Sequence, residues 1–244
     1  MHFFYRGTIA TTFATGLLAI TATAGASPHA AAPLPAADTG LRFEHNAGQF
    51  PEPVEYFARG RGYEVALHEG GAIISLYRSE GPVPTLTREP DPAGTGAAAE
   101  KTSPRELTVR RFGMELVGMD DQATPAGRKK QASRTNYLRG SDQDDWHTDI
   151  ANYARVRYAQ AYEGIDVVFR GDEGRIRHDF VVEPGADPRQ IRVRYRGAEG
   201  LARSKDGDLV LDLGEHELIH KAPVAFQPGS DGSRQLVEAE YVID

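Results

Sequence analysis

Residues 165–185 read IDVVFRGDEGRIRHDFVVEPG, and this stretch contains two short runs in which side chains alternate in character. Val167 and Phe169 share one face of the first run. In the second run, every other residue from Ile176 to Val182 is apolar or His. A period of two is typical of a strand that buries one face, and the intervening GDEG is typical of a tight turn. The stretch therefore predicts a β-hairpin.

The same alternation recurs on both sides of this hairpin. Runs with one apolar face occur at residues 54–58, 63–68, 72–78, 107–116, 154–158, 191–195, 209–213, 216–226 and 237–243. Gly70 and Gly71 indicate a hairpin turn between the second and third runs. In the run at 107–116, the apolar parity changes across Arg110 and Arg111, which predicts a β-bulge there.

Only one helical element is predicted in residues 41–244. Asp187 can cap a short turn over Pro188, Arg189 and Gln190, since Asp is a good cap and Pro suits the first helical position. No amphipathic run is long enough for a substantial helix. Many short strands at hairpin spacing predict an all-β fold, either an antiparallel β-sandwich or an open barrel.

Three polar segments interrupt the strand pattern. Residues 27–40 are rich in Ala and Pro, which predicts a flexible linker before a single domain at 41–244. Residues 80–106 contain five prolines and a Gly/Ala-rich run, and we expect a disordered excursion there. Residues 120–133 are interpreted as a further surface loop.

The N-terminus has the features of a secretory signal peptide. Arg6 precedes an uncharged, moderately apolar run at residues 7–23, and Ala24, Gly25 and Ala26 form a small-x-small cleavage site. The run is rich in Thr and Gly and is a poor match to a membrane-spanning helix, so no transmembrane segment is predicted for the mature chain. We expect residues 1–26 to be removed and the protein to be secreted or displayed on the cell surface.

Charge and cysteine content exclude several functions. The chain of 244 residues has a formal net charge of -7, which argues against nucleic-acid binding because such proteins neutralise phosphates with Lys and Arg. It contains no cysteine, which excludes thiol catalysis, Cys-ligated zinc, iron–sulfur clusters and a lipid anchor on Cys. An exported chain without disulfides must be stabilised by its packed core.

His216, Glu217 and His220 form an H-E-x-x-H motif, the pattern of zinc peptidases. That chemistry requires a helix, which brings the two histidines onto one face. Here a Gly214 turn precedes the motif and Pro223 follows it, leaving no room for a stable helix. We expect a strand, in which His216 ends a hairpin and His220 shares a face with Leu218, Val224 and Phe226. No metal site and no cofactor are therefore predicted.

Two charged clusters are further candidates. Asp142, Asp144 and Asp145 could ligate calcium, but they lack the spacing of an EF-hand, and a solvated turn before a buried Trp146 is the simpler interpretation. Arg192, Arg194 and Arg196 alternate with apolar residues and, together with Arg155 and Arg157, could form a basic face for an anionic partner. The alternative is an ordinary solvent face of a strand.

Several motifs occur in a fixed order along the chain. They are FEHNAGQ (43–49), NYLRG (136–140), YARVRY (153–158), YEGIDVVF (162–169), HDFVVEPGADPRQI (178–191) and APVAFQ (222–227). Together they resemble the N-terminal domain of unknown function that precedes SBBP (seven-bladed β-propeller) repeats in bacterial secreted and surface proteins. The resemblance implies an exported β domain with no catalytic residues to assign. Because no repeats follow here, we expect a stand-alone or truncated copy.

Two functional hypotheses remain. The first is a non-catalytic surface module that binds an unknown protein or glycan partner, or orients a following domain. The second is an exported hydrolase, either a zinc peptidase through His216, Glu217 and His220 or a carbohydrase with an unidentified pair of carboxylates. An uncovered C-terminal edge strand would also promote association of the isolated chain.

Overall fold

The computed structural model describes residues 2–5, 12–19, 41–80, 106–229, 231 and 233–244. These residues form β-strands and two short 3-10 turns, which confirms the predicted all-β class. The turn predicted after Asp187 is η2 (Pro188–Gln190), and the structure adds a second, η1 (Gln143–Asp145). No helix in the described part of the chain is long and apolar enough to cross a membrane.

The strands are short in most of the chain and long around β8 and β9. Their bounds are β1 (His2–Tyr5), β2 (Thr12–Ala19), β3 (Phe43–His45), β4 (Tyr56–Gly60), β5 (Tyr63–His68), β6 (Gly71–Glu80), β7 (Glu106–Leu116), β8 (Pro125–Tyr137), β9 (His147–Tyr162), β10 (Ile165–Asp172), β11 (Arg175–Val182), β12 (Val193–Arg196), β13 (Gly200–Arg203), β14 (Leu209–Asp212), β15 (Glu217–Pro228), β16 (Arg234–Val237) and β17 (Ala239–Val242).

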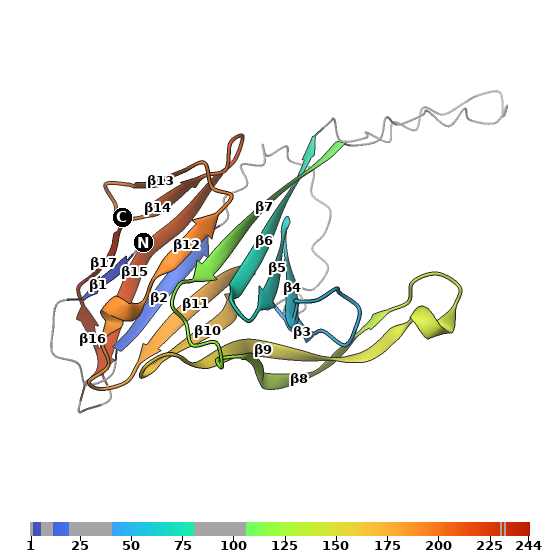
Figure 1. Cartoon of the computed structure of the whole chain (residues 1–244), viewed down its shortest axis with the longest axis horizontal. Coiled ribbons are helices and arrows are strands. Elements are labelled where there is room, and N and C mark those ends of the chain that lie inside the picture. Colours follow the sequence, from blue (N-terminus) through green and yellow to red (C-terminus); the bar gives the residue numbers. More distant parts are fainter. Residues whose placement is uncertain (1, 6–11, 20–40, 81–105, 230, 232) are drawn as a thin grey trace, which may run out of the picture.

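One curled antiparallel sheet forms most of the molecule. Its strand order is β12-β7-β6-β5-β4-β3-β9-β10-β11-β2-β15-β14-β13, with β8 added to β9 and β16 added to β15. Strands β1 and β17 form a separate pair. Figure 1 shows the sheet curling so that its β12 end turns back toward β13, β14 and β15. Of the two predicted architectures, the structure is closer to the open barrel.

The concave face of the sheet holds the core. Its most completely buried large side chains come from strands throughout the sheet and include Phe43, Leu67, Ile74, Tyr158, Phe169, Leu209, Leu211 and Leu218. The predicted hairpin at 165–182 is β10 and β11, and its pairing from Ile165↔Val182 to Asp172↔Arg175 is unbroken. The alternation of buried residues along β11 follows the predicted period of two. Burial of the apolar side chains on this face makes the main favourable contribution to the free energy of folding.

Two local predictions are wrong. Strand β7 pairs with β6 in continuous register through Arg110 and Arg111, without a bulge. Val109 therefore lies on the outer face, where it is 40% exposed. Residues 125–137 belong to strand β8 rather than to a surface loop, because they pair with β9. The polar composition of β8 reflects its largely exposed position beside β9 and not an absence of structure.

The predicted linker at 27–40 and nearly all of the predicted excursion at 80–106 lie outside the described residues. Within the predicted signal peptide, the structure describes strands β1 and β2. Removal of residues 1–26 on export stays a prediction.

Candidate functional site: a pocket between the ends of the sheet

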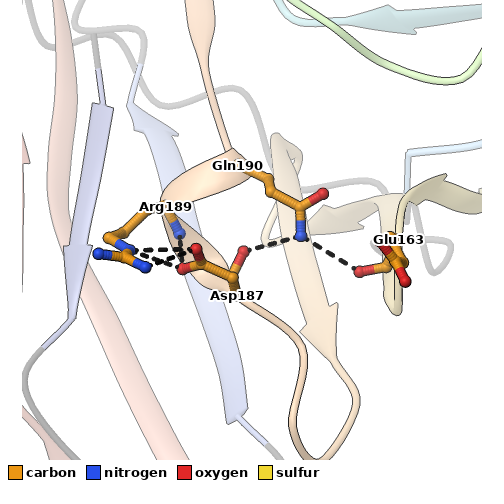
Figure 2. Close-up of polar contacts among 4 residues, drawn as sticks. All are labelled: Glu163, Asp187, Arg189 and Gln190. Carbon is orange, nitrogen blue, oxygen red and sulfur yellow. Dashed lines mark hydrogen bonds and ion pairs between the residues drawn. The ribbon is translucent and has the colours of Figure 1, made fainter.

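The turn η2 determines how the chain enters strand β12. The carboxylate of Asp187 accepts a hydrogen bond from the backbone N–H of Arg189 at 3.0 Å and is also bound by the Arg189 side chain, Nη2 to Oδ2 2.8 Å. Figure 2 shows this cap, together with Gln190, whose side-chain nitrogen donates to the carbonyl oxygens of Asp187 and Glu163. The sequence DPRQ therefore forms a closed turn that is tied to the β9–β10 connection.

Among the described strands, β12 has one pairing partner. It pairs with β7, where Val193 is opposite Leu116. Just before the strand, the carbonyl oxygen of Arg192 accepts hydrogen bonds from the N–H of Val117 at 2.9 Å and from the hydroxyl of Tyr162 at 3.2 Å. Among the described strands, none pairs with the other edge of β12, and none pairs with the outer edge of β13. Strands β12 and β13 are thus the two end strands of the described sheet.

A pocket of about 270 Å3 lies at this opening. Its lining comes from β12, the end of β7, β13 and the C-terminal residues: Val117, Arg192, Val193, Arg194, Tyr195, Leu201, Ile243 and Asp244. Two of the three arginines predicted as a basic face therefore line a concave site together with apolar side chains. This is the combination expected of a binding site, in which polar groups orient a ligand above an apolar floor.

The outer face of β12 carries an excess of positive charge. Arg194 and Arg196 share one acid on β7, with Nη1 of Arg194 3.2 Å and Nε of Arg196 2.5 Å from oxygens of Glu115. The hydrogen bond from Arg196 lowers the pKa of Glu115, so this carboxylate is ionised at neutral pH. Among the described residues, no carboxylate is within ion-pair distance of Arg192. Glu115 therefore faces two of the three guanidinium groups, and Asp244 adds a second acidic residue to the pocket lining.

Beneath the pocket, Tyr195 connects β12 to a buried pair of histidines. The Tyr195 hydroxyl is hydrogen-bonded to Nδ1 of His220 at 2.8 Å, and the rings of His220 and His178 lie 5.0 Å apart. Burial lowers the pKa of His178 to about 4 and lowers that of His220 well below its usual value, so both are neutral at pH 7. Nε2 of His220 is buried without a hydrogen-bond partner. This cluster lies under the site and is closed to solvent.

The H-E-x-x-H residues are arranged along an extended chain. His216 lies in the turn before β15, where its carbonyl accepts from the N–H of Leu213, and Glu217 begins the strand. His220 is fully buried. The motif therefore lacks the helix with which its histidines would share an ion. In the described part of the chain, no group of three His, Asp or Glu residues is placed to hold a metal.

The prediction that His220 shares a face with Leu218, Val224 and Phe226 is only partly correct. Leu218 and His220 point into the core together, as expected. The register of β15 against β2 then shifts between Lys221 and Val224, across Pro223. As a result Val224 is 52% exposed and Ala225 is buried instead. A proline cannot donate a ladder hydrogen bond, which explains why the strand breaks its alternation there.

The remaining candidates are separate from the pocket. Asp142, Asp144 and Asp145 are exposed in η1, where Asp142 caps the turn, and Trp146 after them is half-buried rather than buried. Arg157 pairs with Asp166, Nη2 to Oδ2 2.5 Å, and is thereby engaged within the β9–β10 hairpin. Arg155 is exposed on β9, far along the sheet from β12. The basic face is therefore confined to β12 and to Arg192, which directly precedes it.

Sequence reasoning missed most of the pocket lining. Val117 and Ile243, which line the pocket, and Glu115, which binds two of the arginines, are distant from Arg194 in the chain, and no local pattern marks them as its neighbours. The only sequence feature that pointed to this site was the alternation of arginines with apolar residues around Arg194.

A comparison with family models matches residues 43–244 to the model described as "Domain of unknown function (DUF7948)". No curated protein and no solved structure matches the chain.

Proposed function

Since this chain belongs to the DUF7948 family of domains of unknown function, we propose a role from its own geometry: an exported, non-catalytic interaction module that binds an acidic, extended polypeptide segment in the pocket beside β12. The observation that carries the proposal is the pocket in which Arg192 and Arg194 lie beside apolar side chains, at the β12 end of the sheet. An edge strand offers backbone N–H and C=O groups to an added strand, and flanking side chains give specificity.

The spacing of the arginines suits such a partner. Side chains on one face of a strand recur every two residues, at Arg192, Arg194 and Arg196. A partner strand with acidic residues at every second position would place carboxylates opposite guanidinium groups, which bind them in a planar, two-point arrangement. Its alternate apolar residues would contact Leu201 and Ile243, which also line the pocket.

Export and surface display are part of the same proposal. They are supported by the apolar run at 7–23 and the small-x-small site at 24–26. We also propose that the domain serves as the N-terminal head of SBBP-repeat proteins, either attached to repeats or as a separate copy. A head domain of this kind would bind an acidic segment that belongs to a neighbouring domain or to a surface partner.

The binding test uses the full chain and a fluorescein-labelled peptide that alternates Glu and Val. Fluorescence anisotropy should show saturable binding that the double variant Arg192→Gln/Arg194→Gln weakens by about tenfold or more, because each charge-assisted hydrogen bond contributes substantially. Arg61→Gln/Arg128→Gln removes the same charge from exposed positions outside the pocket and should leave the affinity unchanged.

A second peptide separates strand addition from general attraction to charge. N-methylation at alternate residues removes backbone donors and keeps every carboxylate. We expect this peptide to bind much more weakly. Equal loss of binding in both double variants, or equal binding of the methylated peptide, would refute the proposed site. Tighter retention of heparin than of the peptide would favour a glycan partner instead.

A further inference from the structure

Strand β2 lies in the interior of the sheet, although it belongs to the predicted signal peptide. It pairs antiparallel with β11, from Thr12↔Val182 to Leu17↔Arg177. On its other edge it pairs antiparallel with β15, from Phe13↔Phe226 to Ala19↔Ile219. Figure 1 shows β2 between these two strands. The N-terminal segment therefore joins the part of the sheet that ends at β11, which includes β12, to the part formed by β15, β14 and β13.

Without β2, two strand edges would face each other across a gap. Strands β11 and β15 do not pair with each other in the described structure. Adjacent strands are about 4.8 Å apart, so the gap left between β11 and β15 would be about 9.6 Å, the width of one added strand. Both edges would present unpaired backbone donors and acceptors, which is a strong template for another strand.

His178 and His220 limit the size of the residue that a strand in this gap can have at one position. His178 on β11 is paired with Gly16 of β2, and His220 on β15 is paired with Leu18. The rings of His178 and His220 nevertheless lie 5.0 Å apart, although their strands are separated by β2. Gly16 has no side chain, and paired residues share a face of the sheet. A larger residue at this position would therefore compete with the imidazole of His178 for space.

We propose that the β11–β15 gap is a strand-acceptor site, which in the exported protein takes up an uncharged, extended segment of another polypeptide with Gly at the position paired with His178. The current occupant defines this chemistry, because Thr12–Ala19 contains no charged residue and has Gly16 at that position. The inference rests on the export part of the proposed function and is independent of the arginine pocket.

The test begins with the folded full chain. A protease site inserted within residues 27–40 allows the N-terminal segment to be cut after folding. A labelled peptide of residues 11–20, TTFATGLLAI with added lysines for solubility, is then offered to cut and uncut protein. Uptake is followed by anisotropy, and protection of β11 and β15 by amide hydrogen exchange. A Gly16→Val peptide is compared with Thr15→Val, which places the same residue on the opposite face.

We expect the cut protein to exchange its strand for the labelled peptide and to keep β11 and β15 protected. The Gly16→Val peptide should bind at least about tenfold more weakly than the parent peptide. The Thr15→Val peptide should bind with the same affinity as the parent peptide. Uncut protein should take up none. No uptake after cutting, or equal uptake of both Val peptides, would overturn the proposal. A dimer that protects β11 and β15 without peptide would overturn the assignment to another polypeptide. Because the arginine variants keep this gap, loss of acidic-peptide binding alone would affect only the proposed function.

Discussion

His178 and His220 are the residues in which burial and titration are most directly coupled. Both imidazoles are in the core, with ring centroids 5.0 Å apart, and His178 is also packed between Phe169 and Phe180. A charged imidazole in this environment loses its hydration without a carboxylate to replace it. Neutral histidine is thus a condition of the folded state. The outward neighbour Asp179 instead pairs with Arg170, Nε to Oδ2 2.5 Å.

The first prediction concerns acid stability. Burial lowers the pKa of His178 from 6.5 to about 4, so between these values the unfolded chain binds a proton that the folded chain does not. The free energy of unfolding should therefore fall as pH decreases from about 6.5 toward 4, with about 2 kcal/mol lost at pH 5 through this residue. Urea unfolding at pH 7 and pH 5 measures the loss.

The variant His178→Asn should show a smaller difference between the two pH values, whatever its own stability. His45→Asn is the control, because His45 is exposed at the end of β3. An equal pH dependence in wild type and His178→Asn would contradict the prediction.

At the scale of elements, η2 and β12 form one unit. The Asp187 cap orders the turn, and two hydrogen bonds to the carbonyl of Arg192 fix the entrance to the strand. Strand β12 itself has four residues and, among the described strands, pairs with β7 alone. A short edge strand has few backbone hydrogen bonds of its own, so the preceding turn contributes a large share of its order.

We therefore predict that Asp187→Ala lowers the free energy of unfolding by about 1 kcal/mol, the usual effect of losing a capping side chain. Faster amide exchange should appear in β12 before it appears elsewhere in the sheet. Asp187→Asn keeps an oxygen acceptor for the N–H of Arg189 and should lose much less. Exchange that is unchanged in β12 would show that pairing with β7 alone orders the strand.

At the scale of the whole molecule, the open ends of the sheet are the dominant feature. Strands β12 and β13 are the end strands of the described sheet, and β17 pairs with β1 of the predicted signal peptide. The C-terminal strand is thus covered in the full chain and would become an edge after removal of residues 1–26. Leu236 on β16 adds a side chain that is 74% exposed.

Uncovered edges promote pairing between copies, so we expect light scattering to show that the isolated chain dimerises or aggregates with increasing concentration. Ala202→Lys places a charge on the edge strand β13 and should reduce this association. Ala159→Lys adds the same charge to an exposed position of β9, an interior strand, and serves as the control. A monomer at all concentrations would contradict the prediction.

Local side-chain order was sufficient for much of the fold. The alternation along β10, β11 and β12 identifies which residues are buried, because a strand exposes its two faces at successive positions. The alternation also predicts the exposure of Arg192, Arg194 and Arg196, and the Asp cap followed by Pro predicts the turn at Asp187. It failed at β8, whose polar residues pair with β9, and at Pro223, where β15 changes face.

The sequence by itself therefore determined the all-β class, the faces of most strands and the absence of thiol chemistry. Only the tertiary structure decided that Glu115 lies between Arg194 and Arg196, that Tyr195 reaches His220, and that β2 separates β11 from β15. The physical reason is that alternation specifies which face of a strand is buried but not which strand lies beside it. Neighbours are selected by the combined packing of all strands around the shared core.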